Sequence, residues 1–110
     1  MSEPGGAPRR LTLVADQIGS VYEIRLGGEL DVGGCERLDR ALDQASASDA
    51  RRIRLDLEDL VFIDSAGLQA ILRAKRRGDD DGGRLRMTRG TGEVRKLFEL
   101  TAMDLVLPYE

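Results

Sequence analysis

The sequence contains no histidine and no tryptophan, and only one cysteine, Cys35, among its 110 residues. Without histidine, the chain cannot form a Ser-His-Asp triad, a histidine general base or a histidine-ligated metal site. A single cysteine excludes a disulfide within the chain. These absences remove the commonest serine-hydrolase and metal-centre arrangements, and no cofactor is implied by the residues that are present.

Long apolar runs are also absent. No stretch approaches the roughly 18 residues of a membrane span, and residues 1–10 lack the apolar centre of a signal peptide. Together with the absence of a disulfide, this predicts a cytoplasmic protein without a membrane partner. The length predicts one domain over residues 11–110, preceded by a flexible Pro/Gly-rich tail over residues 1–10.

Charge is unevenly distributed along the chain. The net charge is −3, which argues against general nucleic-acid affinity, yet residues 73–96 hold nine Lys or Arg against four Asp or Glu. This segment contains no aromatic residue on which single-stranded bases could stack. We therefore interpret it as a solvated surface, with a basic face for phosphates or an acidic partner as the alternative.

The order of strands and helices predicts an α/β fold. Alternating apolar residues indicate strands near residues 11–15, 22–26, 53–57 and 85–87, with a short last strand at 105–107. Helical spacing indicates helices from about residue 33 to 45, from 65 to 77, and after residue 92. Residues 58–64 are expected to be a connection, and residues 78–83 a turn-rich loop. This order predicts a mixed, mainly parallel sheet of four to five strands, with an antiparallel hairpin at one side and about three helices packed on it.

The most informative stretch is residues 61–72, where a short apolar run meets the start of a helix. Asp64 and Ser65 fall at the predicted helix N-terminus, where their side-chain oxygens can accept hydrogen bonds from unpaired backbone N–H groups. The small residues Ala66 and Gly67 let the first turn approach neighbouring backbone. Either the stretch presents a hydroxyl beside a carboxylate for recognition, or Asp64 or Ser65 is only a helix cap.

Four further features have both a functional and a purely structural interpretation. Asp31 is expected to cap the first helix and, since it also follows a strand, to lie near Asp64. Cys35 is expected to be a small core residue rather than a reactive thiol. Thr91, between two glycines, is expected to cap the third helix rather than to bind phosphate. The acidic residues of 78–83 lack the spacing of a calcium loop and are expected to form a turn.

Three strings of residues resemble the STAS domain, and more narrowly the bacterial anti-sigma factor antagonists. The most specific is Phe62-Ile63-Asp64-Ser65-Ala66-Gly67-Leu68. The string Leu26-Gly27-Gly28-Glu29-Leu30-Asp31 and the later string Val94-Arg95-Lys96-Leu97-Phe98-Glu99-Leu100-Thr101 add to it. The resemblance covers about residues 11–107, nearly the whole chain.

This resemblance implies a regulator without catalysis of its own. In the family, an anti-sigma factor that is also a serine kinase phosphorylates the serine after the aspartate, which here is Ser65. The unmodified antagonist binds the anti-sigma factor and frees the sigma factor; the phosphorylated form does not bind, and a PP2C-type phosphatase resets it. The residues expected to meet the partner are Asp31, Asp64, Ser65, Ala66 and Gly67.

The sequence departs from the family pattern at two places. Ala66 stands where many members have a second Ser or Thr, which leaves Ser65 as the obvious phosphate acceptor. The sequence also ends at Glu110, where many members continue into another helix.

Other functions compete with this one. STAS proteins also serve as accessory subunits of lipid-transporting ABC systems or as parts of stress-sensing complexes. Ser65 could alternatively be only a cap. A hydrolase is disfavoured because Ile63 occupies the glycine position of a nucleophile elbow and no Ser-x-x-Lys motif follows.

Overall fold

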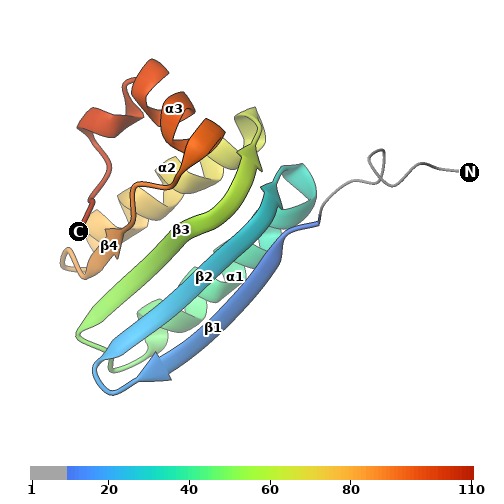
Figure 1. Cartoon of the computed structure of the whole chain (residues 1–110). Coiled ribbons are helices and arrows are strands. Elements are labelled where there is room, and N and C mark those ends of the chain that lie inside the picture. The colour runs from blue at the N-terminus through green and yellow to red at the C-terminus, as the bar shows by residue number, and fades with distance from the viewer. Residues whose placement is uncertain (1–9) are drawn as a thin grey trace, which may run out of the picture.

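The computed structural model describes residues 10–110 and confirms the predicted α/β fold. The expected flexible tail lies almost wholly outside the described residues. Four strands and three helices follow one another in the order β-β-α-β-α-β-α, with a short 3-10 helix near the end (Figure 1). Their bounds are β1 Thr12–Ile18, β2 Val21–Leu30, α1 Val32–Ala47, β3 Arg52–Ile63, α2 Ser65–Asp80, β4 Leu85–Met87, α3 Gly92–Leu100 and η2 Met103–Leu105.

The strands form one mixed sheet in the order β1-β2-β3-β4. β1 and β2 are an antiparallel hairpin, as predicted, whereas β2, β3 and β4 run parallel to one another. Parallel neighbours end at the same edge of a sheet. The register pairs Leu30 with Ile63, so the residues that follow β2 and β3 emerge side by side.

Helices α1 and α2 pack together on one face of the sheet, and α3 lies beside the end of β3 (Figure 1). The core consists of the apolar side chains between these layers. The largest fully buried ones are Phe98, Ile24, Leu26, Leu30, Leu38, Leu55, Leu57, Leu60, Ile71, Met87 and Val94. Burying each large apolar side chain contributes about 1.5–3 kcal/mol to folding.

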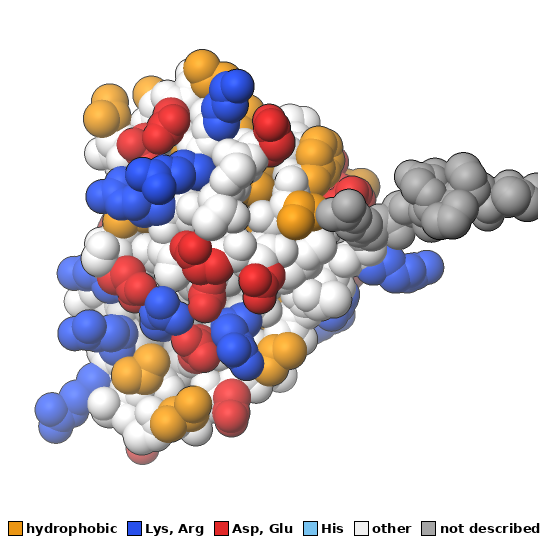
Figure 2. Space-filling view, viewed as in Figure 1, with side chains coloured by type: hydrophobic (Ala, Val, Ile, Leu, Met, Phe, Trp, Pro, Cys, Tyr) orange, Lys and Arg blue, Asp and Glu red, His pale blue; other side chains and the backbone are white. Residues whose placement is uncertain are grey.

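Below α3, the other face of the sheet is open and carries intermixed acidic and basic side chains (Figure 2). Arg54 is the centre of this group: its guanidinium forms ion pairs with Glu23, Asp56 and Glu110. The network joins β2, β3 and the last residue of the chain across the open face.

Four boundaries differ from the prediction by three residues or more: β1 and β2 continue to Ile18 and Leu30, and β3 and α2 are also longer than expected. β3 does not stop near residue 57 but continues through the expected connection to Ile63, with two register shifts against β2. The first bulge lies between Asp56 and Asp59 and the second between Leu60 and Phe62, and each inserts an extra residue that interrupts the alternation of a strand. Likewise, α2 continues through the buried Gly78 to Asp80, and an added Cβ at Gly78 would lie 2.8 Å from the Leu85 Cβ atom.

The predicted last strand at residues 105–107 is wrong. Ala102 adopts a left-handed backbone conformation, with φ of 61°, and the chain then forms the 3-10 helix η2. Only Leu107 of the apolar run is buried, while Leu105 is 85% exposed. Strand-like pairing occurs later, as a single bridge between Tyr109 and Met87.

Candidate partner-binding site

The starts of α1 and α2 lie next to each other at one end of the sheet. Asp31 and Asp64 each follow one of the register partners Leu30 and Ile63, and the Asp64 N–H donates to the Leu30 carbonyl over 3.2 Å. The expectation that Asp31 lies near Asp64 is therefore confirmed. Two helix N-termini, each preceded by an aspartate, form one corner of the molecule.

Each aspartate caps its own helix. The Asp31 Oδ1 atom accepts from the Gly33 N–H at 3.0 Å, and the Asp64 Oδ1 atom accepts from the Gly67 N–H at 2.8 Å. Such side-chain acceptors satisfy backbone donors that have no partner within the helix, and each contributes about 1 kcal/mol to stability. The expected cap at Asp31 is confirmed, and at α2 the cap is Asp64.

Ser65 is the first residue of α2, and its side chain is exposed. Because Asp64 supplies the cap, the Ser65 hydroxyl is not used for it. Within residues 10–110, the structure shows no side-chain hydrogen bond from this hydroxyl. The site therefore presents an available hydroxyl group on a rigid helix start beside a carboxylate.

Gly67 is buried and fixes how closely α2 approaches the sheet. A Cβ atom at this position would lie 2.3 Å from the Leu30 carbonyl oxygen and 2.6 Å from the Ile63 Cγ1 atom. No side chain fits these distances without movement of the backbone. Gly67 thus supports the position of Ser65 from below, whereas the neighbouring Ala66 is half-buried.

Cys35 connects the two helix starts from inside. Its thiol lies 3.2 Å from the Asp31 carbonyl oxygen and 3.5 Å from the Ala66 carbonyl oxygen. Burial raises the pKa of the Cys35 thiol above its ordinary value, so the thiol is less ionised at neutral pH. This agrees with the predicted role as a small packing residue.

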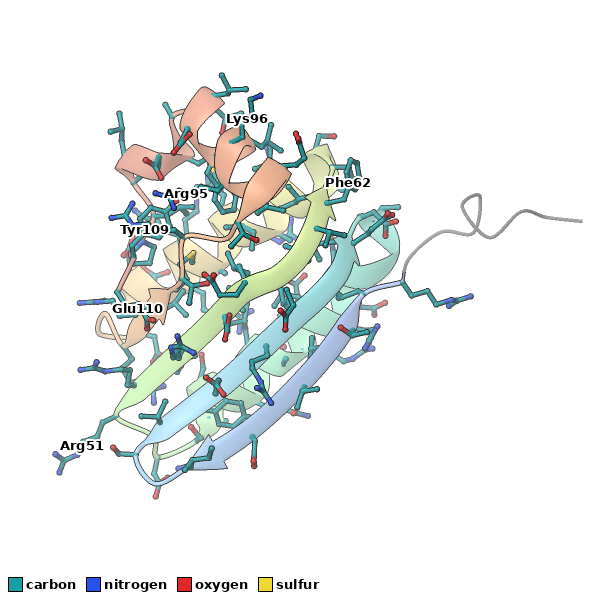
Figure 3. All side chains as sticks on the ribbon, viewed as in Figure 1. Arg51, Phe62, Arg95, Lys96, Tyr109 and Glu110 are labelled. Atoms are coloured by element: carbon teal, nitrogen blue, oxygen red, sulfur yellow. The ribbon has the colours of Figure 1, made fainter. Side chains whose placement is uncertain are left out.

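Apolar side chains that the sequence analysis did not single out flank this corner. Val32, directly after Asp31, is 76% exposed, and Phe62, two residues before Asp64, is 46% exposed. Figure 3 shows Phe62 at the end of β3, pointing outward. The sequence does show two apolar residues, Val61 and Phe62, shortly before Asp64. However, alternation alone does not tell which residue of a β-bulged strand faces solvent, so their exposure could not be predicted.

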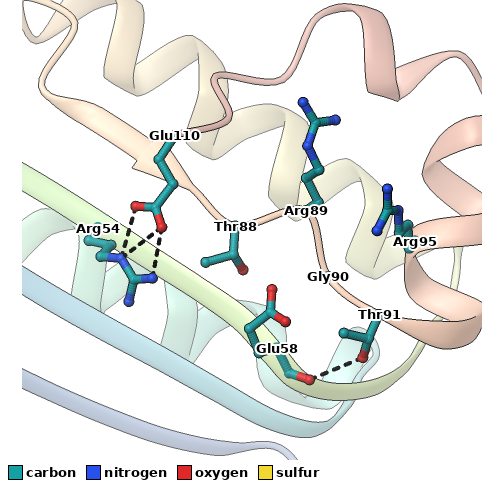
Figure 4. Close-up of a pocket in the computed structure, with 8 residues that line it drawn as sticks. All are labelled: Arg54, Glu58, Thr88, Arg89, Gly90, Thr91, Arg95 and Glu110. Carbon is teal, nitrogen blue, oxygen red and sulfur yellow. Dashed lines mark hydrogen bonds and ion pairs between the residues drawn. The ribbon is translucent and has the colours of Figure 1, made fainter.

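A pocket of about 360 Å³ lies elsewhere, between β3, β4 and the start of α3 (Figure 4). Most of the polar side chains that line this pocket already have a hydrogen-bond or ion-pair partner within the protein. Arg54 is held by Glu110, and the Thr91 hydroxyl donates to the Glu58 carbonyl at 3.1 Å. Thr91 occupies the expected N-cap position of α3, but its side chain makes no capping hydrogen bond.

The basic segment over residues 73–96 is mostly neutralised by ion pairs. Arg73 and Arg77 pair with Asp39 and Asp43 on α1. Four further ion pairs involve this segment: Lys75–Asp79, Arg84–Asp81, Arg89–Asp104 and Arg95–Glu99. Arg84 also donates hydrogen bonds to the Ser46 and Ala50 carbonyls. This agrees with the interpretation of the segment as a solvated surface.

Two kinds of feature are absent from the described residues. Residues 10–110 contain no group of three or more Cys, Asp or Glu side chains arranged to hold a metal ion. None of the helices in this part of the chain has the length and apolar character needed to cross a membrane.

Comparison with known proteins finds relatives both by sequence and by fold. A Staphylococcus aureus anti-sigma-B factor antagonist is 28% identical over 82 residues, which are 74% of this chain and 76% of that protein. An anti-sigma factor antagonist from Mycobacterium paratuberculosis has the same fold, with a TM-score of 0.77 and 21% identity over 99% of this chain and 89% of its own. The unphosphorylated anti-sigma factor antagonist SpoIIAA gives a TM-score of 0.63 and 25% identity over 86% of this chain and 97% of its own.

The family model described as "Mlab, STAS domain" matches residues 14–108. The chain therefore belongs to the STAS domain family, as its sequence strings indicated. Its curated relatives are anti-sigma factor antagonists, which are regulatory proteins rather than enzymes.

Proposed function

We propose that this protein is an anti-sigma factor antagonist controlled by phosphorylation of Ser65. The unmodified form binds an anti-sigma factor with serine kinase activity through the corner formed by Asp31, Asp64, Ser65, Ala66 and the buried support Gly67. Binding releases a sigma factor. Phosphorylation of Ser65 by the bound kinase ends the interaction, and a PP2C-type phosphatase restores it.

One observation supports this proposal above the others: Asp64 caps α2, so the exposed Ser65 hydroxyl is left available. A serine that only capped the helix would direct its oxygen back to the backbone N–H groups of the first turn. Here that role belongs to Asp64. The hydroxyl is therefore accessible to a kinase and to a partner surface.

The proposed switch is electrostatic. Phosphorylation adds roughly 1.5–2 negative charges to Ser65. The N-terminus of α2 tolerates an anion, so the domain stays folded. With Asp31 and Asp64 beside it, however, the phosphate concentrates negative charge on a corner that previously presented a neutral hydroxyl. Like-charge contacts across an interface cost several kcal/mol, and about 2.8 kcal/mol weakens binding 100-fold.

The relatives support this mechanism in two ways. The S. aureus protein is named as an antagonist of an anti-sigma factor. SpoIIAA has been solved in both unphosphorylated and phosphorylated forms, and the phosphorylated Bacillus protein has a TM-score of 0.67 to this chain, at 24% identity. A fold of this kind is thus compatible with both states.

A pull-down from the native cell extract tests the proposal. Wild type and Ser65→Ala are expected to capture a kinase-fold anti-sigma factor, whereas Ser65→Asp is not. Ser20→Asp is the matched control, because Ser20 is an exposed serine in the β1–β2 turn at the opposite end of the sheet, and it should bind like wild type. If all variants capture the same protein equally, Ser65 is not the switch.

The accessory-subunit function is the second candidate. The matching family model is described by Mlab rather than by an anti-sigma factor antagonist, so the family match alone does not select the partner. In this case the same corner would bind a transporter ATPase or a component of a stress-sensing complex. The same pull-down separates the candidates, because an ATPase captured by wild type, Ser65→Ala and Ser65→Asp alike supports the second one.

A further inference from the structure

The two edge strands of the sheet, β4 and β1, differ in whether another segment pairs with their backbone. At the β4 edge, the C-terminal segment supplies backbone partners: the Met87 N–H donates to the Pro108 carbonyl at 2.9 Å, and the Glu110 N–H donates to the Met87 carbonyl at 3.0 Å. At the other edge, no segment within residues 10–110 pairs with the outer side of β1. Backbone groups along this edge are available to another strand.

β1 also lacks most of the features that usually prevent edge-to-edge pairing, and Asp16 is its one charged residue. Edge strands are commonly protected by lysine, proline, a bulge or very short length. The seven residues of β1 include no lysine, arginine or proline, and their register with β2 is regular throughout. Val14 and Ile18 are exposed on the strand, at 54% and 67%.

We infer that β1 is a self-association edge, which pairs antiparallel with β1 of a second copy around Ala15. This two-fold arrangement joins the two sheets into one continuous sheet of eight strands. It places Val14 opposite Asp16 of the second copy and Thr12 opposite Ile18 of the second copy. No two like charges of β1 face each other in this register.

Charge complementarity favours a second copy of this chain as the partner that pairs with the β1 edge. Within one copy, Asp16 lies directly opposite Glu23 on β2, an unfavourable pairing of like charges. Arg25 lies opposite Val14, is largely exposed, and has only a 3.7 Å ion pair with Glu23. In the dimer, four side chains lie in a row across the open faces of the joined sheets. Glu23 of β2 and Asp16 of β1 come from one copy, followed by Val14 of β1 and Arg25 of β2 from the second copy.

The spacing of this row allows an ion pair. Adjacent strands lie about 4.8 Å apart, so the Cα atoms of Asp16 and the second copy's Arg25 are separated by about 10 Å. An arginine side chain can cross the small Val14 side chain and meet the carboxylate. Because the dimer has two-fold symmetry, the ion pair between Asp16 and Arg25 occurs twice. Because β3 lies two strands away from β1, the corner with Ser65 stays free in both copies.

Sedimentation velocity from low micromolar to near-millimolar protein tests the inference. The wild type is expected to shift from monomer to dimer with rising concentration. Asp16→Arg or Arg25→Glu should each raise the dissociation constant about tenfold, since each change acts twice across the axis. Combining the two substitutions reverses both charges and should restore the wild-type value.

Two controls keep the result specific. Asp80→Arg makes the same charge change at the end of α2, beside β4 rather than β1, and should leave dimerisation unchanged. Circular dichroism verifies that each variant is folded. A wild type that stays monomeric over the whole range, or a dimer that responds equally to Asp16→Arg and Asp80→Arg, overturns the inference. Ser65→Asp should dimerise normally, so failure of the phosphorylation switch would not affect this result.

Discussion

At the scale of single residues, the site depends on a division of roles between adjacent side chains. Asp64 binds the backbone of its own helix, and this leaves Ser65 available on the surface. Gly67 allows the helix to approach the Leu30 carbonyl, and Cys35 packs between the two helix starts. A hydroxyl group held in this way has a fixed position, which is what a kinase and a binding partner both require.

Gly67→Ala is predicted to lower the free energy of unfolding by about 1–3 kcal/mol, because the added methyl group overlaps the Leu30 carbonyl and the Ile63 side chain. Urea denaturation measures this loss. Gly33→Ala is the matched control at the start of α1. There an added Cβ would meet only the Asp31 Oδ1 atom, at 3.3 Å, and no backbone atom. Equal stability of the two variants would contradict the close packing described for Gly67.

At the scale of elements, the parallel pairing of β2 with β3 produces the site. Two strands that end at the same edge bring two helix N-termini together, and the exposed apolar residues Val32 and Phe62 flank them. Interfaces commonly combine an apolar anchor with a polar group that sets specificity. The acidic corner and its apolar flanks fit that description.

Phe62→Ala is predicted to weaken partner binding by about tenfold or more, because aromatic anchors often contribute over 1 kcal/mol to an interface. Its half-exposed side chain implies a smaller effect on folding. Isothermal titration calorimetry with the captured partner provides the measurement. Leu105→Ala is the control, since Leu105 is an exposed apolar residue of η2, outside the corner. If Leu105→Ala weakens binding as much as Phe62→Ala, the partner surface lies elsewhere.

The starts of the helices could be predicted from sequence because capping is local chemistry. Asp31 and Asp64 directly precede α1 and α2; the structure confirms the expected cap at Asp31 and shows that Asp64, rather than Ser65, caps α2. The extension of β3 was missed because its bulges depend on pairing with β2. The prediction of a last strand at residues 105–107 was wrong, because the left-handed turn at Ala102 contains no glycine that would indicate it in the sequence. The exposure of Phe62 likewise depends on the tertiary structure.

At the scale of the whole molecule, the open face is tied together by charge. Arg54 on β3 binds Glu23 on β2 and Glu110 at the end of the chain. The hydrogen bonds from Arg54 lower the pKa of the Glu110 carboxyl below its ordinary value. A carboxyl whose pKa is lower in the folded state stabilises the fold above its unfolded pKa, and this contribution is lost as the pH falls through the folded value.

Glu110→Gln is therefore predicted to reduce the loss of stability on acidification below about pH 5. At neutral pH the variant should be slightly less stable than wild type, because one hydrogen-bonded ion pair is missing; the exposure of this pair keeps the effect small. Thermal unfolding measured at several pH values provides the comparison. Glu93→Gln, at an exposed position of α3, is the control and should keep the acid sensitivity of the wild type.

The fold was predictable as a whole because the order of strands and helices allows few arrangements. The roles of Ser65, Asp31, Asp64, Ala66 and Gly67 in partner binding stay predictions, since they concern contacts with a second protein. Family membership follows from the match over residues 14–108, whereas a shared fold does not by itself identify the partner.

The most direct test of the central proposal is the affinity of the purified kinase-type anti-sigma factor for two forms of this protein. One form is unmodified, and the other is phosphorylated at Ser65, as verified by mass spectrometry. The account predicts that phosphorylation weakens binding about 100-fold or more while both forms keep the same circular dichroism spectrum. Equal affinity of the two forms, or phosphorylation at a residue other than Ser65, would contradict it.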